Sequence, residues 1–301
     1  MLTGWLAIAA PVCVPTTSVA RDSATVVVAV ADSELRVESR GGRLTSENVD
    51  LATWVRRSAT IVRGYYGYFP LASVTVRVTF TDGTRVITGH TSVWPHAVID
   101  VTVGRDVTAA ALLDDWILIH EMIHLALPEV GDEHNWLAEG LATYVEGVAR
   151  VQAGNMAADR LWAEYVAQMP RGLPGTADRG LDHTHTWART YWGGALYCLQ
   201  ADVSIRVQTQ GRRGLRDALQ VIGRDSGGMR ADWSIAKVLA TGDAATGTHV
   251  LTDLYSEMKD APTEPDLGAL WEQLGIQVSG DQVRLNDDAP LATVRRAITT
   301  P

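Results

Sequence analysis

The sequence predicts an α+β fold in which a small mixed sheet is followed by a mainly helical C-terminal region. Residues 25–31, 73–80 and 86–103 carry runs or alternations of β-branched residues, which are typical of strands. After residue 105 the apolar residues recur mainly at helical spacing, up to a strand-like stretch at 276–285. With 46% hydrophobic and 20% charged residues among 301, the chain can bury one or two sizeable cores.

The first 20 residues have the pattern of a secretory signal peptide. Residues 2–14 are mostly apolar but too short to span a bilayer, and the small residues 18–20 form a cleavage site. We therefore expect a secreted or extracytoplasmic protein. Because no Lys or Arg precedes the apolar run, a buried N-terminal strand or a misassigned start is the alternative.

The two cysteines are not expected to form a disulfide. Cys13 lies in the predicted signal peptide, and Val12 before it departs from the lipoprotein pattern. Removal of that peptide leaves Cys198 alone, most simply as a small core residue.

Residues 21–104 are expected to form the N-terminal α/β part of one catalytic unit. Its elements are, in order, a strand at 25–31, a helix at 47–66, a strand at 73–80 that ends at a turn, and a strand or strand pair at 86–103 that is interrupted near Pro95.

Two histidines at helical spacing indicate a metal site. Residues 120–124 read His-Glu-Met-Ile-His, and four residues turn a helix by about 400°, so His120 and His124 share one face. Glu121 lies about 100° around the helix, where its carboxylate can act on a water molecule without being a ligand. Catalytic zinc sites have three protein ligands and one open position, so a third ligand is needed.

A second helix is expected to supply that ligand. Pro128 cannot continue the first helix, and a second can begin near Asn135, which is a good N-cap. Glu139 lies in its first turns. Antiparallel packing of the two helices would aim Glu139 at the histidines, and Gly140 would allow them to approach closely.

The predicted ligands of one Zn²⁺ per chain are His120, His124 and Glu139. Asp132 and His134 are alternative ligands, but both fall in the connecting turn and are expected to be solvated. A metzincin would need glycine and histidine where this chain has Leu127 and Val130, which excludes that class.

Together these segments resemble the gluzincin metallopeptidases, specifically the catalytic core shared by the aminopeptidase N-type and glycyl aminopeptidase families. Their second helix typically reads Trp-x-x-Glu-Gly-x-x-x-Tyr, a pattern matched by Trp136, Glu139, Gly140 and Tyr144. The resemblance covers roughly residues 85–225. It implies a zincin-like catalytic domain, with a small mixed sheet beside the HExxH helix, that hydrolyses peptide bonds with Glu121 as the general base.

The resemblance also implies roles for Glu146 and Tyr191. Glu146 matches a frequent family acid that could accept a hydrogen bond from a zinc-binding histidine; a solvated helix charge is the alternative. Tyr191 matches a family tyrosine that stabilises the oxyanion; a buried aromatic at a helix start is the alternative. Upstream of His120 we find no Gly-x-Met-Glu-Asn sequence, the family element that holds the substrate α-ammonium. Aminopeptidase and endopeptidase activities therefore both stay open.

The last strand before the histidine helix is expected to form the edge of the cleft, where an extended peptide would add by main-chain hydrogen bonds. Residues 89–98 are expected to line this cleft. We expect an ordinary surface or loop role for His90, His96, His183 and His185. Contact with the substrate is the alternative for each.

The helical zinc-binding region is expected to extend over residues 105–275, and residues 276–301 to form a hairpin and a tail. Within the former we expect a helix at 155–168, a loop at 170–185 near the site entrance, and further helices to about residue 274.

Charge and composition limit the partners. The net charge is −9, and the lack of basic runs argues against nucleic acid and anionic membranes. No stable membrane insertion is expected, and a peptide or protein substrate fits best. The sequence thus predicts a zinc metallopeptidase. The alternative is a catalytically silent zincin-like scaffold that binds a peptide or protein.

Overall fold

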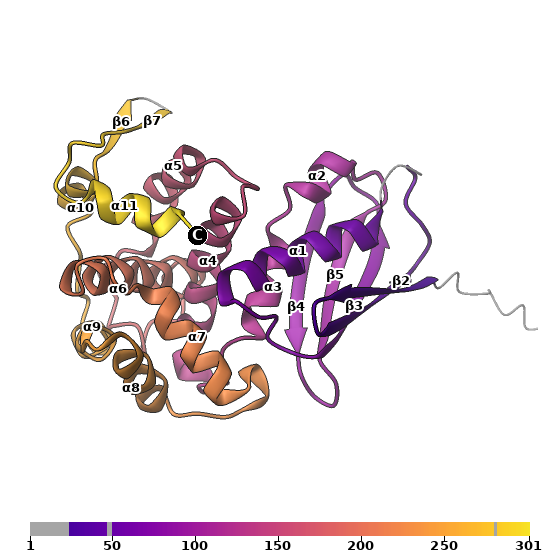
Figure 1. Ribbon diagram of the computed structural model, residues 1–301, viewed down its shortest axis with the longest axis horizontal. Helices are drawn as coiled ribbons and strands as arrows, with labels where there is room; N and C mark the ends of the chain where they lie inside the picture. Colours follow the sequence, from indigo (N-terminus) through magenta and orange to yellow (C-terminus); the bar gives the residue numbers. More distant parts are fainter. Residues whose placement is uncertain (1–23, 47–49, 280–281) are drawn as a thin grey trace, which may run out of the picture.

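The computed structural model describes residues 24–46, 50–279 and 282–301. A sheet occupies one side of the molecule, and most of the helices are gathered on the other (Figure 1). The expected combination of a small mixed sheet with a helix-rich remainder is confirmed. The predicted signal peptide lies outside the described residues.

The sheet has five strands in the order β1-β2-β3-β5-β4. Their bounds are Ala24–Val30 for β1, Ser33–Arg40 for β2, Ser73–Thr81 for β3, Val86–Ser92 for β4 and Val98–Gly104 for β5. The central strands β2, β3 and β5 are parallel, and β1 and β4 pair antiparallel at the two edges. The predicted strand pair over 86–103 is therefore β4 and β5, of which β4 is the edge strand.

Strand β2 was not expected. Its residues alternate in burial, with Leu35 and Val37 in the core and charged side chains between them. Those charges are solvated on the outer face, and the strand is stabilised by parallel pairing with β3, which begins 40 residues after β2 does.

Helix α1 (Leu51–Tyr66) connects β2 to β3. The carboxylate of Asp50 accepts hydrogen bonds from the backbone N–H groups of Ala52 and Thr53, at 2.9 and 3.2 Å, so the helix begins after this cap. The helix ends at Gly67, whose φ of 78° favours glycine. Residues 47–49, at the start of the predicted helix, lie outside the described residues.

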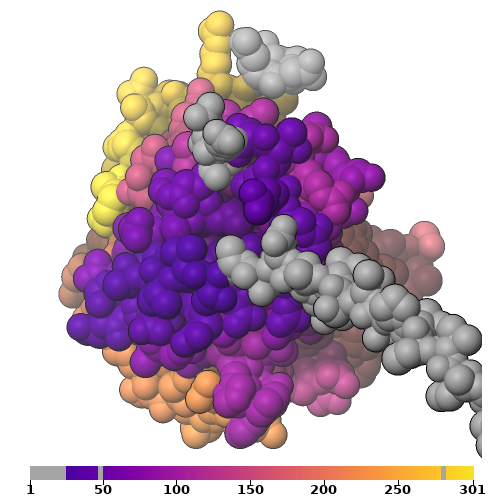
Figure 2. Space-filling view, turned by 90° about the vertical axis from the view of Figure 1, so that its right-hand side faces the viewer, coloured from indigo at the N-terminus to yellow at the C-terminus, as the bar shows by residue number. Residues whose placement is uncertain are grey.

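The later helices begin beside the sheet and continue into the other half of the molecule (Figure 1). They are α2 (Ala109–Leu113), α3 (Ile117–His124), α4 (Asn135–Gln152), α5 (Ala158–Gln168), α6 (Gly194–Gln208), α7 (Leu215–Ser226), α8 (Ile235–Thr246), α9 (Val250–Met258), α10 (Leu267–Leu274) and α11 (Ala292–Thr299). Seen from the sheet end, the surface is formed mainly by the N-terminal residues (Figure 2). In the part of the chain that the structure describes, no helix combines the length and the apolar character needed to cross a bilayer.

The C-terminal segment is more ordered than a hairpin and a tail. The hairpin is present as β6 (Ile276–Ser279) and β7 (Gln282–Leu285), but it is followed by α11. Arg295 of that helix is buried, and its guanidinium donates to the carbonyls of Leu274 and Asn286 at 2.8 and 2.9 Å. The segment after the hairpin thus includes a helix, which a buried arginine joins to the end of α10.

Candidate metal centre

Helix α3 holds both histidines in the interior between the sheet and α4. The carboxylate of Asp115 accepts hydrogen bonds from the backbone N–H groups of Ile117 and Leu118, at 3.2 and 3.1 Å, which fixes the start of the helix. His120 is buried, and His124 lies one turn further on the same face. Their rings are 4.9 Å apart, centre to centre.

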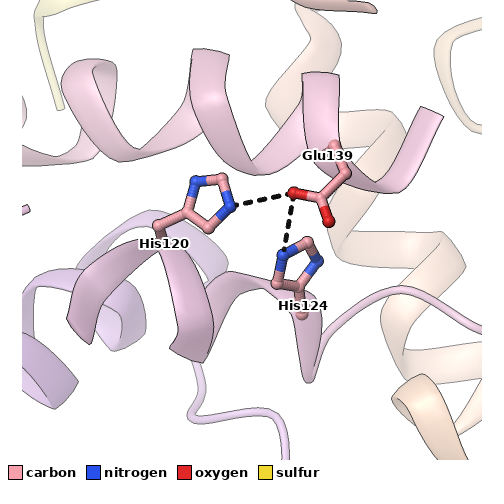
Figure 3. A group of neighbouring side chains, drawn as sticks. All are labelled: His120, His124 and Glu139. Atoms are coloured by element: carbon pink, nitrogen blue, oxygen red, sulfur yellow. Dashed lines mark hydrogen bonds and ion pairs between the residues drawn. The ribbon is translucent and has the colours of Figure 1, made fainter. Parts of the chain in front are cut away.

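Helix α4 brings Glu139 to this pair (Figure 3). Oε2 of Glu139 lies 3.1 Å from Nε2 of His120 and 3.5 Å from Nε2 of His124. One ligand atom from each of the three residues lies within 4.8 Å of the others. Two imidazole nitrogens and one carboxylate oxygen form a donor set that zinc uses in hydrolases, so these three residues could hold such an ion.

The predicted N-cap of α4, Asn135, is wrong. The N-cap residue is His134, and Asn135 is the first residue of the helix. Neither of the alternative ligands belongs to the group of three residues that could hold a metal ion. Asp132 is exposed in the connecting turn, as expected, but His134 is buried.

Electrostatics in the ligand group follow from burial and mutual contact. Burial alone would raise the pKa of Glu139, but its hydrogen bonds with His120 and His124 outweigh that effect and hold the pKa well below its usual range. Burial lowers the pKa of His120 despite its contact with Glu139. Burial would also lower the pKa of His124, but its hydrogen bond with Glu139 and the nearby acidic charges outweigh that effect and raise it. Glu139 and His120 thus have the protonation states that a metal ion requires, and a bound ion would release any proton that His124 holds.

Glu121 lies against the edge strand β4. The hydroxyl of Thr91 donates to Oε2 of Glu121 at 2.7 Å, and Glu121 is only 8% exposed. A Cβ at Gly89 would lie 2.5 Å from Cγ of Glu121, so only glycine leaves room for this carboxylate. The structure thus places Glu121 beside the ligands, with its orientation fixed by a strand rather than by its own helix.

Tyr191 lies on the other side of the group, in a π-helical turn that covers Arg189–Gly193 and precedes α6. Its ring stacks on that of His120, with centroids 6.1 Å apart and an interplanar angle of 12°. Burial, and then the charges of Glu139 and Glu121, raise the pKa of Tyr191 to about 12. The phenol is therefore protonated at neutral pH and can donate a hydrogen bond.

Contact between two glycines brings Tyr191 to helix α4, which carries Glu139. A Cβ at Gly140 would lie 2.2 Å from Cα of Gly194, and a Cβ at Gly194 would lie 2.1 Å from the carbonyl oxygen of Trp136. Gly140 does permit a close approach, as predicted, but this contact is with α6 and not with the histidine helix.

Glu146 is buried on α4, and its carboxylate forms an ion pair with Arg150 at 3.5 Å. Burial raises the pKa of Glu146 to about 8. Nδ1 of His120 is buried without a hydrogen-bond partner among the described residues. The predicted bond from a histidine ring to Glu146 is therefore not made in this structure, and its role stays a prediction.

A cavity of about 390 Å³ opens beside the ligand group. Its lining includes His120, Glu121 and Tyr191, together with Gly89 from β4. Within the stretch 89–98 that was expected to line the cleft, Gly89 is the residue that does so.

The other histidines lie away from the ligands. His90, His96 and His185 are exposed, and Nε2 of His183 lies 2.8 Å from Oδ1 of Asp260. The structure therefore agrees with ordinary surface roles for them.

Asp182 holds the 170–185 loop to the start of α4. Its carboxylate accepts hydrogen bonds from Nε1 of Trp136 at 2.8 Å and from the hydroxyl of Tyr255 at 2.6 Å, and Nδ1 of His134 lies at 3.0 Å. His134 is thus a partner of Asp182, which explains why it is not solvated. Sequence reasoning missed this contact because its partners are 46 to 73 positions apart.

No family model matches the sequence, and no curated protein does. Solved structures do match in fold. An aminopeptidase N family protein from Idiomarina loihiensis has a TM-score of 0.65 at 13% identity, over 86% of this chain and 50% of that chain. An M1 zinc metallopeptidase from Deinococcus radiodurans has a TM-score of 0.52 at 17% identity, over 82% and 53%. Aminopeptidase A from Legionella pneumophila, in complex with aspartic acid, has a TM-score of 0.52 at 14% identity, over 80% and 28%.

These similarities concern the fold. The chain spans about half the length of the first two structures and less of the third. The fold of this protein is therefore similar to part of the M1 zinc metallopeptidases.

Proposed function

We propose that this protein is a zinc-dependent metallopeptidase. The observation that carries the proposal is the convergence of His120, His124 and Glu139, whose ligand atoms lie within 4.8 Å of one another, with Glu121 beside them. A purely structural zinc site has no use for a carboxylate held next to the ligands without being one. The similarity in fold to M1 zinc metallopeptidases supports the same class.

Each residue has a part in this reaction. His120, His124 and Glu139 would hold one zinc ion, which when bound polarises the attacking water and the scissile carbonyl. Glu121 takes the proton of the water and passes it to the leaving amine. Tyr191 donates a hydrogen bond to the oxygen that becomes negative when water adds to the carbonyl.

Peptides are the proposed substrates. A mutant of the Deinococcus radiodurans enzyme has been solved with a Tyr-Ser-Ala substrate, which supports this class. The edge strand β4 borders the cavity at Gly89, where no side chain covers the backbone. An extended peptide can add to such an edge by main-chain hydrogen bonds. A secreted or extracytoplasmic location remains part of the proposal.

The test compares the wild-type chain with Glu121→Gln. Both are loaded with zinc, their zinc content is measured, and each is incubated with a mixed peptide library, with and without chelator. Glu121→Gln should retain zinc but lose at least about a hundredfold in turnover, the low end for a general base. The same change at the exposed Glu272 of α10 is the control and should alter neither.

Two results would contradict the proposal. Hydrolysis that persists in a clean Glu121→Gln sample would refute the role of the glutamate. One zinc per wild-type chain with no cleavage of any peptide would favour the silent scaffold instead.

A further inference from the structure

The cavity beside the candidate metal centre is acidic. Among the described residues its lining contains the carboxyl groups of Glu121, Glu146 and Glu164 and no lysine or arginine. Glu121 is bonded to Thr91, and Glu146 is paired with Arg150. Glu164, on α5, is half-buried and makes no hydrogen bond or ion pair within the described residues.

Neither Arg150 nor Arg160 forms an ion pair with Glu164, because both are bonded to other carboxylates. Arg160 donates through both terminal nitrogens to the two oxygens of Asp114, each at 2.8 Å. Arg150 donates to Asp114 at 2.9 Å in addition to its contact with Glu146. Burial raises the pKa of Glu164, and the charges of Arg150 and Arg160 offset this shift only in part.

The rim of the same cavity is apolar and aromatic. Ile87, Trp116 and Trp187 line it and are 44%, 48% and 54% exposed. Trp187 is held in place by stacking on Tyr191, with centroids 5.4 Å apart, and by the guanidinium of Arg171, 4.9 Å from its centroid. Large apolar side chains exposed around a pocket mark a surface that is covered when a ligand binds.

The free carboxylate of Glu164 favours one kind of ligand group. A group with several N–H donors could bond to Glu164, whereas a carboxylate would be repelled and a neutral alkyl chain would leave Glu164 unpaired.

We propose that this cavity binds a lysine or arginine side chain of the substrate, next to the scissile bond, with the aliphatic stem along the Ile87, Trp116 and Trp187 rim and the charge at Glu164. The inference rests on the proposed peptidase function and names its substrate class. A long cationic side chain matches the site because its stem is apolar and its end is charged. A free α-ammonium has no stem and would leave the aromatic rim unused.

The test uses matched peptides after library mapping of the cleaved bond. The residue flanking that bond is Lys or norleucine, and Arg or citrulline, so that each pair changes mainly the charge. Wild type should cleave the charged member with a kcat/KM about ten- to hundredfold higher, the range for a hydrogen bond to a charged group. Glu164→Gln should lose this preference, Glu164→Lys should favour a glutamate at the same position, and Glu272→Gln should keep the wild-type preference.

Thermal unfolding of each variant shows whether it is folded. If Glu164→Gln does not fold, the wild-type Lys and norleucine pair decides alone. Equal kcat/KM for that pair, or an unchanged preference in Glu164→Gln, would overturn the proposal. Loss of cleavage on N-terminal acetylation, with no difference between Lys and norleucine, would assign the cavity to a free N-terminus instead.

A binding experiment separates this proposal from the peptidase function itself. Calorimetry with the zinc-loaded Glu121→Gln chain should show tighter binding of the Lys peptide than of its norleucine partner. If chelator-sensitive cleavage is absent but the Lys peptide still binds more tightly than the norleucine peptide, only the peptidase function is refuted. Absence of both the cleavage and the difference would sink this inference as well.

Discussion

Replacing Gly140 with alanine tests how the two halves of the candidate site are held together. The added Cβ would lie 2.2 Å from Cα of Gly194, whereas ordinary contact begins at 3.4 Å, so α4 and α6 must separate by about 1.2 Å. Overpacking of this kind lowers the free energy of unfolding by about 1–3 kcal/mol. Because Glu139 lies on α4 and Tyr191 on the turn that leads into α6, the shift also misplaces them. A displacement of about 1 Å can reduce turnover about a hundredfold.

Gly64→Ala is the matched control. Gly64 lies on α1 and is exposed, and no atom lies within 4 Å of the position that an added Cβ would take. The same chemical change there should raise the free energy of unfolding by about 0.5–1 kcal/mol, since alanine is the better helix former. Urea denaturation and kcat/KM would be measured on both. If Gly140→Ala had wild-type stability and wild-type kcat/KM, the reasoning from the glycine contact would be refuted.

Three other predictions concern single side chains. Tyr191→Phe should lower kcat by about a hundredfold or more with zinc content unchanged. Tyr68→Phe is the control and should leave kcat unchanged, because the Tyr68 hydroxyl donates to the carbonyl of Gln220. Equal kcat values for the two variants would contradict the oxyanion role of Tyr191. Asp182→Ala should lower the free energy of unfolding by about 2–4 kcal/mol in urea, because it leaves buried donors without an acceptor; a change below about 0.5 kcal/mol would argue against the network. Burial raises the pKa of Asp115 from 3.8 to about 6, so the folded state holds this proton more tightly than the unfolded chain does. The free energy of unfolding should therefore fall as pH rises between those values. Asp115→Asn should reduce the slope of this free energy against pH, and an unchanged slope would contradict the pKa shift.

Local periodicity predicted the parts of this protein that depend on one segment at a time. The spacing of His120, His124 and Glu139 was sufficient to predict that the three converge, because two helices joined by a short turn have few ways to pack. Strand β3 was found for a similar reason, since its alternating residues reflect one buried and one more exposed face.

Contacts between distant segments could not be predicted in this way. His134 was expected in water because nothing near it in sequence reveals Asp182, and the partner of Gly140 was assigned to the nearest helix instead of to α6. Strand β2 was missed because charged residues flank its two core positions. Helix α11 was missed because it has only eight residues and its buried face includes an arginine. These features are decided by tertiary packing, which overrides local preference.

The contact between Gly140 and Gly194 also affects the order in which the parts of the site come together as the chain folds. The predicted ligands lie within 20 consecutive residues on neighbouring helices, whereas Tyr191 reaches them from a segment that is synthesised later. Contacts that are local in sequence form sooner than those that close a long loop. We therefore expect a growing chain to be able to capture its ion before α6 docks on α4, so that metal loading would come first and catalytic competence would be the last step of maturation.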